Sequence, residues 1–174
     1  PDDRARVVRA YVGDRSNRRH KPGRAMERAD YRFDVLCDFG AFRDLQRHRM
    51  LTNEWQRLGT QHGYSVPQTI ETTGRAATWR EAMERMAALH VAVNATGGPD
   101  VAQYAVPLAY RIRFVMQLNV REAFHLLELR TSRQGHADYR RVCQEMHRLI
   151  RDQAGHTVIA EAMKFVDTND YDLE

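Results

Sequence analysis

Cysteine, lysine and long apolar runs are all scarce in this chain of 174 residues. The two cysteines, Cys37 and Cys143, have no second Cys or His nearby at metal-ligand spacing, so neither a zinc site nor a disulfide framework is predicted. Such cysteine usage favours a reducing cytoplasm. No apolar run approaches the roughly 20 residues of a membrane span and no signal peptide opens the chain, so we expect no membrane association.

Lys21 and Lys164 are the only lysines, although lysine and arginine together number 27. Arginine is therefore the main cation, and its planar fork can bind phosphate or carboxylate through two parallel hydrogen bonds. Nine of these basic residues crowd into positions 4–28. This basic segment is predicted either to meet an anionic ligand or partner, or to form a solvated arm.

Length and composition fit one ordinary globular domain over residues 1–174. The apolar fraction is 43% and the charged fraction is 29%. A chain of this size can bury a core without disulfide or metal staples. The sequence begins with Pro1 rather than Met, and we expect it to be one domain of a longer protein.

Two segments alternate apolar and polar residues, which predicts strands with one buried face: Tyr31–Phe39 and Leu108–Leu118. Helices are predicted elsewhere by apolar residues that recur every three or four positions. Strands and helices do not alternate regularly, so the pattern favours an α+β fold over a doubly wound sheet. The main helices are expected over residues 41–55, 76–94, 119–131 and 139–150, with short ones at 4–10 and 158–166.

The first candidate site is Arg47-His48-Arg49, within the helix expected over 41–55. Neighbouring helical residues point about 100° apart, so these three cannot share one face. They could contact different parts of one large anionic ligand or ligands of adjacent subunits. A solvated basic helix face is the alternative interpretation.

The second candidate site begins at Asn119, directly after a predicted strand. Asn119 and Glu122 form a capping-box pattern that opens a helix, and a helix N-terminus with Arg121 beside it can bind an anion. Asn119 and Arg130 lie near one helix face, whereas Arg121, His125 and Glu128 lie on another. An ordinary capped helix is the alternative interpretation.

Taken together, Arg47-His48-Arg49 and the pattern Asn-x-Arg-x-x-x-His-x-x-x-x-Arg at 119–130 resemble the flavin-dependent thymidylate synthases. Residues 24–27 with the Phe33-containing strand, and residues 136–140, add to the resemblance, which covers about residues 22–140. It implies a small antiparallel sheet with packed helices. It also implies FAD-dependent methylation of deoxyuridylate to thymidylate, with methylenetetrahydrofolate and NADPH as co-substrates.

The same resemblance implies roles for individual residues. FAD contacts are expected from Arg47, His48, Arg49, Asn119, Arg121, His125, Arg130 and His136. Arg130 is expected to reach both flavin and pyrimidine, and it is the predicted catalytic residue. The nucleotide, deoxyuridylate or a related pyrimidine nucleotide, is expected to meet Arg47, Glu54, Arg57 and Arg130. Family members are usually homotetramers with shared sites, and a longer form carries this domain twice in one chain, so a homotetramer or a tandem partner domain is expected.

Several positions depart from the family pattern on the nucleotide side. Arg57 stands where the family has a serine, seven residues after Arg-His-Arg. Asp44 replaces a glutamine that the family carries three residues before Arg-His-Arg. Gln103 replaces an arginine. A catalytically diverged, non-catalytic domain that supports a partner domain is therefore the second hypothesis. A nucleic-acid-binding module is the third and the least favoured, because no recognisable nucleic-acid motif is present.

Overall fold

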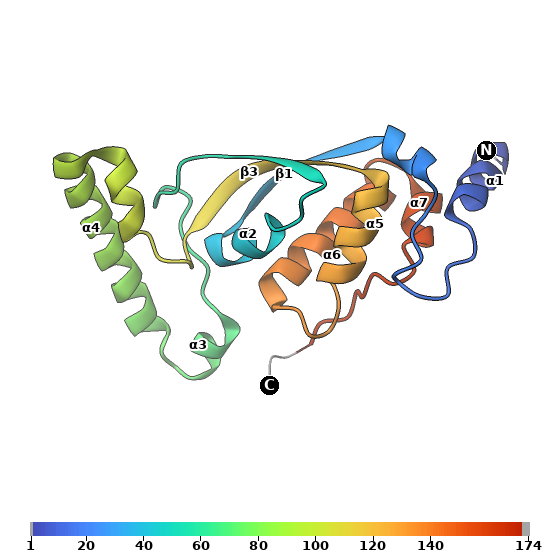
Figure 1. Ribbon diagram of the computed structural model, residues 1–174. Helices are drawn as coiled ribbons and strands as arrows, with labels where there is room; N and C mark the ends of the chain where they lie inside the picture. Colours follow the sequence, from blue (N-terminus) through green and yellow to red (C-terminus); the bar gives the residue numbers. More distant parts are fainter. Residues whose placement is uncertain (1, 172–174) are drawn as a thin grey trace. The chain divides into compact units, whose positions relative to one another are not determined.

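A computed structural model describes residues 2–171 (Figure 1). Pro1 and residues 172–174, the two ends of the expected domain 1–174, lie outside the described residues. Within the described range, no helix is long and apolar enough to cross a membrane. In chain order the elements are α1 (Asp2–Val12), η1 (Arg24–Arg28), β1 (Asp30–Asp38), α2 (Phe39–Leu45), β2 (Leu51–Trp55), α3 (Gln68–Thr72), α4 (Ala76–Ala102), η2 (Gln103–Ala105), β3 (Arg111–Asn119), α5 (Val120–Arg130), α6 (Ala137–Asp152) and α7 (Thr157–Ala162).

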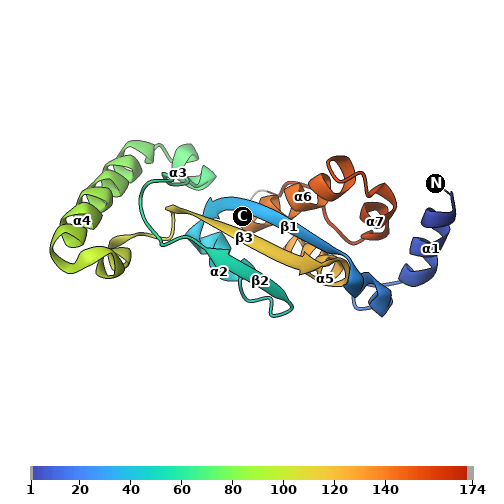
Figure 2. The same cartoon turned by 90° about the horizontal axis from the view of Figure 1, so that it is seen from above.

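The three strands form one sheet in the order β1-β3-β2, with β3 in the centre (Figure 2). Val120 N–H donates to Ala29 C=O at one end and Phe39 N–H to Tyr110 C=O at the other, as antiparallel pairing of β1 and β3 requires. Burial alternates along both strands. The α+β fold with a small antiparallel sheet is thereby confirmed.

The described residues form two compact units, and each of the three strands continues from one unit into the other. The first unit comprises residues 2–35, 45–53 and 115–171, and the second comprises 36–44 and 54–114. The predicted site residues fall into both. All of those on α5 and on the Arg-His-Arg segment belong to the first unit.

In the first unit, α5 packs on α6, and α7 packs on both α6 and α1. Figure 1 shows α5 and α6 side by side. The apolar sides of these helices are buried or half-buried, and together they form the core of the unit. Its most buried apolar residues include Met116, Leu118, Phe124, Leu126, Leu127, Cys143, Met146 and Ile150.

An ion pair lies inside this core. Arg15 donates to both carboxylate oxygens of Glu128, at 2.7 and 2.6 Å, and the two side chains are 3% and 0% exposed. The guanidinium carbon lies 4.9 Å from the ring centre of Phe124 and 5.4 Å from that of Phe165. Arg15 therefore belongs neither to a solvated arm nor to a ligand site, although it lies within the basic segment 4–28.

In the second unit, α4 begins at Ala76 as the periodicity predicts. Gly98, with φ 79° and ψ 172°, interrupts the helix beside Pro99, four residues after the end expected at residue 94. Tyr110 anchors the helix, because its hydroxyl donates to Met83 C=O at 2.7 Å. Phe42 packs edge-on against Phe114 at 4.7 Å between ring centres.

The helix expected from Ala41 to Trp55 is wrong. α2 ends at Leu45, a turn follows, and Leu51–Trp55 is strand β2. Pairing with β3 continues to Gln56, whose N–H donates to Arg113 C=O. The backbone groups of this segment form hydrogen bonds with β3, which is distant in sequence. A local sequence pattern cannot reveal such partners. The second strand was also expected too early, because residues 107–109 form a turn and β3 begins at Arg111.

Removal of the Glu128 charge should destabilise the fold strongly. In Glu128→Gln the Arg15 guanidinium stays buried without a counter-charge, and breaking such a pair costs about 3–5 kcal/mol. Urea unfolding followed by circular dichroism measures the effect. The matched control is Glu145→Gln, whose carboxylate pairs with Arg148 on the surface and should matter far less. Equal stability losses in the two variants would contradict the structural role of the Arg15–Glu128 pair.

Candidate functional site

Arg47, His48 and Arg49 lie on the turn between α2 and β2, not on a helix. The turn separates their surroundings: Arg47 and Arg49 are exposed, whereas His48 is only 8% exposed. The three residues therefore differ in their access to a ligand. The outer two can meet a ligand or partner, and the middle one packs into the first unit.

Helix α5 supplies the facing residues, and its start is capped as predicted. Asn119 Oδ1 accepts a hydrogen bond from Glu122 N–H at 2.9 Å. The carboxylate of Glu122, which the capping-box pattern would direct toward the Asn119 backbone, instead contacts His48. His125 lies one turn further along, and Arg130 ends the helix.

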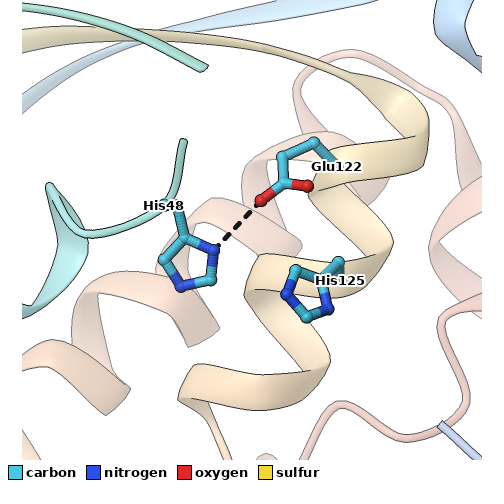
Figure 3. A group of neighbouring side chains, drawn as sticks. All are labelled: His48, Glu122 and His125. Atoms are coloured by element: carbon cyan, nitrogen blue, oxygen red, sulfur yellow. Dashed lines mark hydrogen bonds and ion pairs between the residues drawn. The ribbon is translucent and has the colours of Figure 1, made fainter. Parts of the chain in front are cut away.

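These side chains converge on His48, as Figure 3 shows for Glu122 and His125. His48 Nδ1 lies 3.0 Å from Glu122 Oε1, and Arg130 Nε lies 3.0 Å from His48 Nε2. The ring centres of His48 and His125 are 5.4 Å apart. Since His48, Glu122 and His125 each offer a ligand atom within 4.8 Å of the others, the cluster has the composition of a cation site as well as of a hydrogen-bond chain.

The loop before η1 runs along α5 beside His125. Arg15 contacts both Glu128 and the C=O of His20, and Arg121 Nε donates to Pro22 C=O at 2.9 Å. Because Arg121 and Glu128 lie one turn before and one turn after His125 on the helix, the loop is held along this face. The basic residues between its two attachment points are Arg18, Arg19 and Lys21.

The charges of this loop affect the pKa of His125. Burial lowers the pKa of His125 below its ordinary value of 6.5. The positive charges of Lys21 and Arg18 lower the pKa further, whereas the Glu122 carboxylate opposes the shift. The pKa of His125 therefore lies below its ordinary value, and the ring is neutral near pH 7.

Two other predicted cofactor residues have protein partners. Arg121 is half-buried and its Nη1 lies 2.9 Å from Glu27 Oε1, in addition to its bond to Pro22. His136 is exposed and caps α6 by accepting from Asp138 N–H at 3.3 Å.

Tyr139 connects His136 to the cluster. Its ring centre is 6.4 Å from that of His136 and 5.4 Å from the guanidinium carbon of Arg130. From the sequence, Tyr139 was expected only within an amphipathic helix, with no part in the site. Glu122 was expected as a helix cap or as an ion-pair partner of an arginine on the same helix, because no local signal reveals a carboxylate that turns toward a distant histidine.

The remaining predicted nucleotide residues, Glu54 and Arg57, belong to the second unit and are exposed. Arg57 pairs with Asp100 at 2.9 Å on the surface. Gln103 Oε1 accepts from Leu58 N–H at 3.1 Å. The first unit thus joins His48, His125 and Arg130, while Arg57 and Gln103 have partners within the second unit.

Sequence comparison identifies a family. Residues 6–155 match the family described as thymidylate synthase complementing protein. Proteins named UPF0159 protein are also similar: the one from Chlamydia muridarum is 42% identical over 172 residues, and the one from Chlamydia pneumoniae is 41% identical over 173. A relative from Thermoplasma acidophilum is 39% identical over 160 residues. The matches cover 99%, 99% and 91% of this chain but 32% of each relative, so the chain spans about a third of their length.

Solved structures share the fold. The UMP/dUMP methylase PolB from Streptomyces cacaoi, solved with 5-Br dUMP, superposes with a TM-score of 0.74 at 18% identity, covering 94% of this chain and 81% of that one. Thymidylate synthase X from Helicobacter pylori, solved with FAD and dUMP, superposes with a TM-score of 0.65 at 17% identity, covering 93% and 84%.

The loop–helix arrangement predicts how His125 titrates. Replacing the nearby cation in Lys21→Met should raise the pKa of His125, since the Lys21 charge disfavours the protonated ring. Proton NMR titration of the histidine ring signals measures it. Lys164→Met removes the only other lysine, which does not act on His125, and is the matched control. A wild-type pKa at or above 6.5, or equal shifts in both variants, would refute the described environment.

Proposed function

The chain belongs to the family of thymidylate synthase complementing proteins, the flavin-dependent thymidylate synthases, and on this basis we propose that it methylates deoxyuridylate, or a related pyrimidine nucleotide, with FAD as cofactor. One observation carries the proposal: the two arginine-rich segments meet in one unit, where Arg130 contacts His48 across 82 positions of sequence. Support for the ligand classes comes from the similar folds solved with FAD and dUMP and with 5-Br dUMP.

The first unit fits a flavin dinucleotide in charge. A diphosphate requires cations, and Arg18 and Lys21 supply the positive field around His125. Asn53 Oδ1 on β2, four residues after Arg49, is a buried acceptor without a hydrogen-bond partner among the described residues, so it suits a donor on a ligand. We assign the cofactor to Arg47, His48, Arg49, Asn119, Arg121, His125, Arg130 and His136. When bound, the flavin would carry hydride from NADPH, while methylenetetrahydrofolate supplies the carbon.

Arg130 is the residue we assign to catalysis. Its Nε is bonded to His48 and its guanidinium lies over Tyr139, so the fork is preorganised. A permanent cation held beside a pyrimidine stabilises negative charge that develops on the ring during reaction. Arg130 would thus both orient the nucleotide base and lower the barrier to its methylation.

The nucleotide phosphate is the less favourable part of the proposal. Of the expected contacts, Arg47 and Arg130 belong to the first unit, whereas Glu54 and Arg57 belong to the second. Arg57 must leave Asp100 to bind a phosphate. Loss of one arginine–phosphate fork costs on the order of 2–3 kcal/mol of binding.

The internal partners of Arg57 and Gln103 favour a second candidate function, a non-catalytic domain that supports a partner domain. The relatives are about three times as long as this chain, so another part of such a protein could carry the reaction.

In either case the exposed turn that carries Arg47 and Arg49 suggests an interface. Met50 is 69% exposed beside Arg47 and Arg49, and this surface suits a second subunit of a homotetramer or a tandem domain.

Flavin retention tests the cofactor assignment. Arg49→Ala removes an exposed cation of the turn and should weaken FAD binding about tenfold, as expected for one charged hydrogen bond. The measurement is titration of FAD into the 174-residue chain, followed by quenching of flavin fluorescence. Arg85→Ala, an exposed arginine paired with Glu81 on α4, is the matched control. Equal affinity in Arg49→Ala and wild type would sink the assignment of Arg49.

Charge at position 44 tests the nucleotide assignment. If Asp44 faces the phosphate, repulsion costs about 1–3 kcal/mol, or roughly tenfold to a hundredfold in affinity. We therefore expect wild-type protein to bind deoxyuridylate more weakly than FAD, and Asp44→Asn to bind it at least about tenfold more tightly than wild type. Calorimetric titration into FAD-loaded protein measures both, with Asp170→Asn as an exposed control. Tight deoxyuridylate binding by wild type, unaffected by Asp44→Asn, would contradict this expectation.

A further inference from the structure

Glu122 is a charged residue of the site whose carboxylate the cap does not need. It lies in the first turn of α5 and is 9% exposed. Its backbone N–H already satisfies the cap through Asn119, at 2.9 Å. The buried carboxylate is directed at His48 Nδ1, 74 positions away in sequence and 3.0 Å away in space (Figure 3). A buried carboxylate that makes a long-range contact rather than a capping contact requires another explanation.

The hydrogen bonds of His48 determine where its ring proton sits. Arg130 Nε lies 3.0 Å from His48 Nε2, and an arginine Nε–H can only donate. Nε2 must therefore be the acceptor, and the ring proton must be on Nδ1. There it points at Glu122 Oε1, which accepts it. Glu122 and Arg130 together select one tautomer of a neutral imidazole.

The same bonds orient Arg130. A guanidinium is planar, so fixing its Nε direction and the plane of its face fixes the whole fork. His48 receives the Nε–H, and the ring of Tyr139 lies 5.4 Å from the guanidinium carbon. If His48 carried its proton on Nε2 instead, that N–H would face the Arg130 Nε–H, and the contact that holds the fork would be lost.

We propose that Glu122 is a positioning residue: by accepting the His48 Nδ1–H it keeps His48 Nε2 available to hold Arg130 in its ligand-facing orientation. Glu122 itself touches neither cofactor nor substrate in this role. The proposal rests on the proposed function only in that the ligand of Arg130 is taken to be the flavin and the pyrimidine. The Glu122–His48–Arg130 chain itself is independent of the ligand.

A metal ion held by His48, Glu122 and His125 is the competing use of the same atoms. Coordination through His48 Nε2 would displace the Arg130 Nε–H and bring a cation next to a guanidinium. Coordination through Nδ1 would remove the ring proton while Nε2 still accepts from Arg130, leaving an imidazolate. The first arrangement is unfavourable because it places two positive charges side by side. The second requires a neutral imidazole to lose its remaining ring proton, which costs free energy of binding. The hydrogen-bond chain therefore explains the cluster better than a cation does.

Histidine tautomers are measured directly by NMR. In protein labelled with ¹⁵N-histidine and ¹⁵N-arginine, wild-type His48 should show protonated Nδ1 and unprotonated Nε2 at pH 7.5. The Arg130 Nε–H signal should be resolved and shielded from exchange. Glu122→Ala should lose the tautomer preference and the Arg130 signal, whereas Glu122→Gln, whose amide oxygen can still accept, should keep both. Glu145→Ala on α6 is the control and should leave both signals unchanged.

FAD titration of the same proteins tests whether the Glu122–His48–Arg130 hydrogen-bond chain affects ligand binding. Glu122→Ala should weaken FAD binding about tenfold, and Glu122→Gln should restore it to near the wild-type value. If wild-type protein binds no FAD, the proposed function fails, and the NMR result still decides the Glu122–His48–Arg130 chain. If Glu122→Ala does not fold, the wild-type spectrum and Glu122→Gln decide it.

Three results would overturn the proposal. The first is a wild-type His48 protonated on Nε2 or on both nitrogens at pH 7.5. The second is a folded Glu122→Ala variant in which the His48 tautomer and the Arg130 signal are unchanged. The third is a shift of the His48 and His125 signals on adding equimolar ZnCl₂, with loss of the Arg130 Nε–H signal, which would identify a metal site instead.

Discussion

A neutral imidazole held between a carboxylate and a guanidinium joins the two functional segments of this protein. His48 comes from a turn, and both of its partners come from α5, 74 and 82 positions further along the chain. Each bond determines the other, because one ring nitrogen can accept only if the other carries the proton. The position of Arg130, and with it any chemistry assigned to this residue, therefore depends on a carboxylate that does not need to meet a ligand.

Helix α5 uses its two buried carboxylates for different purposes. Glu122 contacts a neutral side chain and orients it, whereas Glu128 neutralises the buried Arg15. The second pair attaches the basic loop to the helix, so the loop is an integral part of the first unit. The loop in turn carries the cations that lower the pKa of His125. Structural and electrostatic functions of the basic segment are thus divided between neighbouring residues of one loop.

The relation to thymidylate synthases is uneven over the molecule. The cluster of His48, His125 and Arg130 lies in one unit, and the proposed function assigns it to the cofactor. Arg57 and Gln103, which it assigns to the nucleotide side, lie in the other unit and have partners of their own. Under these proposed assignments, the pattern is consistent with either a changed substrate or a supporting domain. An enzyme must bind the nucleotide, whereas a supporting domain need not, but both functions require the same fold.

Sequence alone was sufficient for the fold class, for the presence of strands β1 and β3, and for the helix that Asn119 caps. These features depend on local periodicity and on a cap three residues wide, which neighbouring residues encode directly. It was also sufficient for the family, because the ordered spacing of Arg47-His48-Arg49 and Asn119 to Arg130 is itself a sequence property. Only the tertiary structure decided that residues 51–55 form a strand, since their backbone partners lie on β3, about 60 positions later. Only the tertiary structure distinguished Arg15, which is buried as a counter-ion, from the exposed Arg47 and Arg49, and it alone showed that the Glu122 carboxylate contacts His48. Burial and long-range pairing determine what a charged side chain does, and neither is written in the residues next to it.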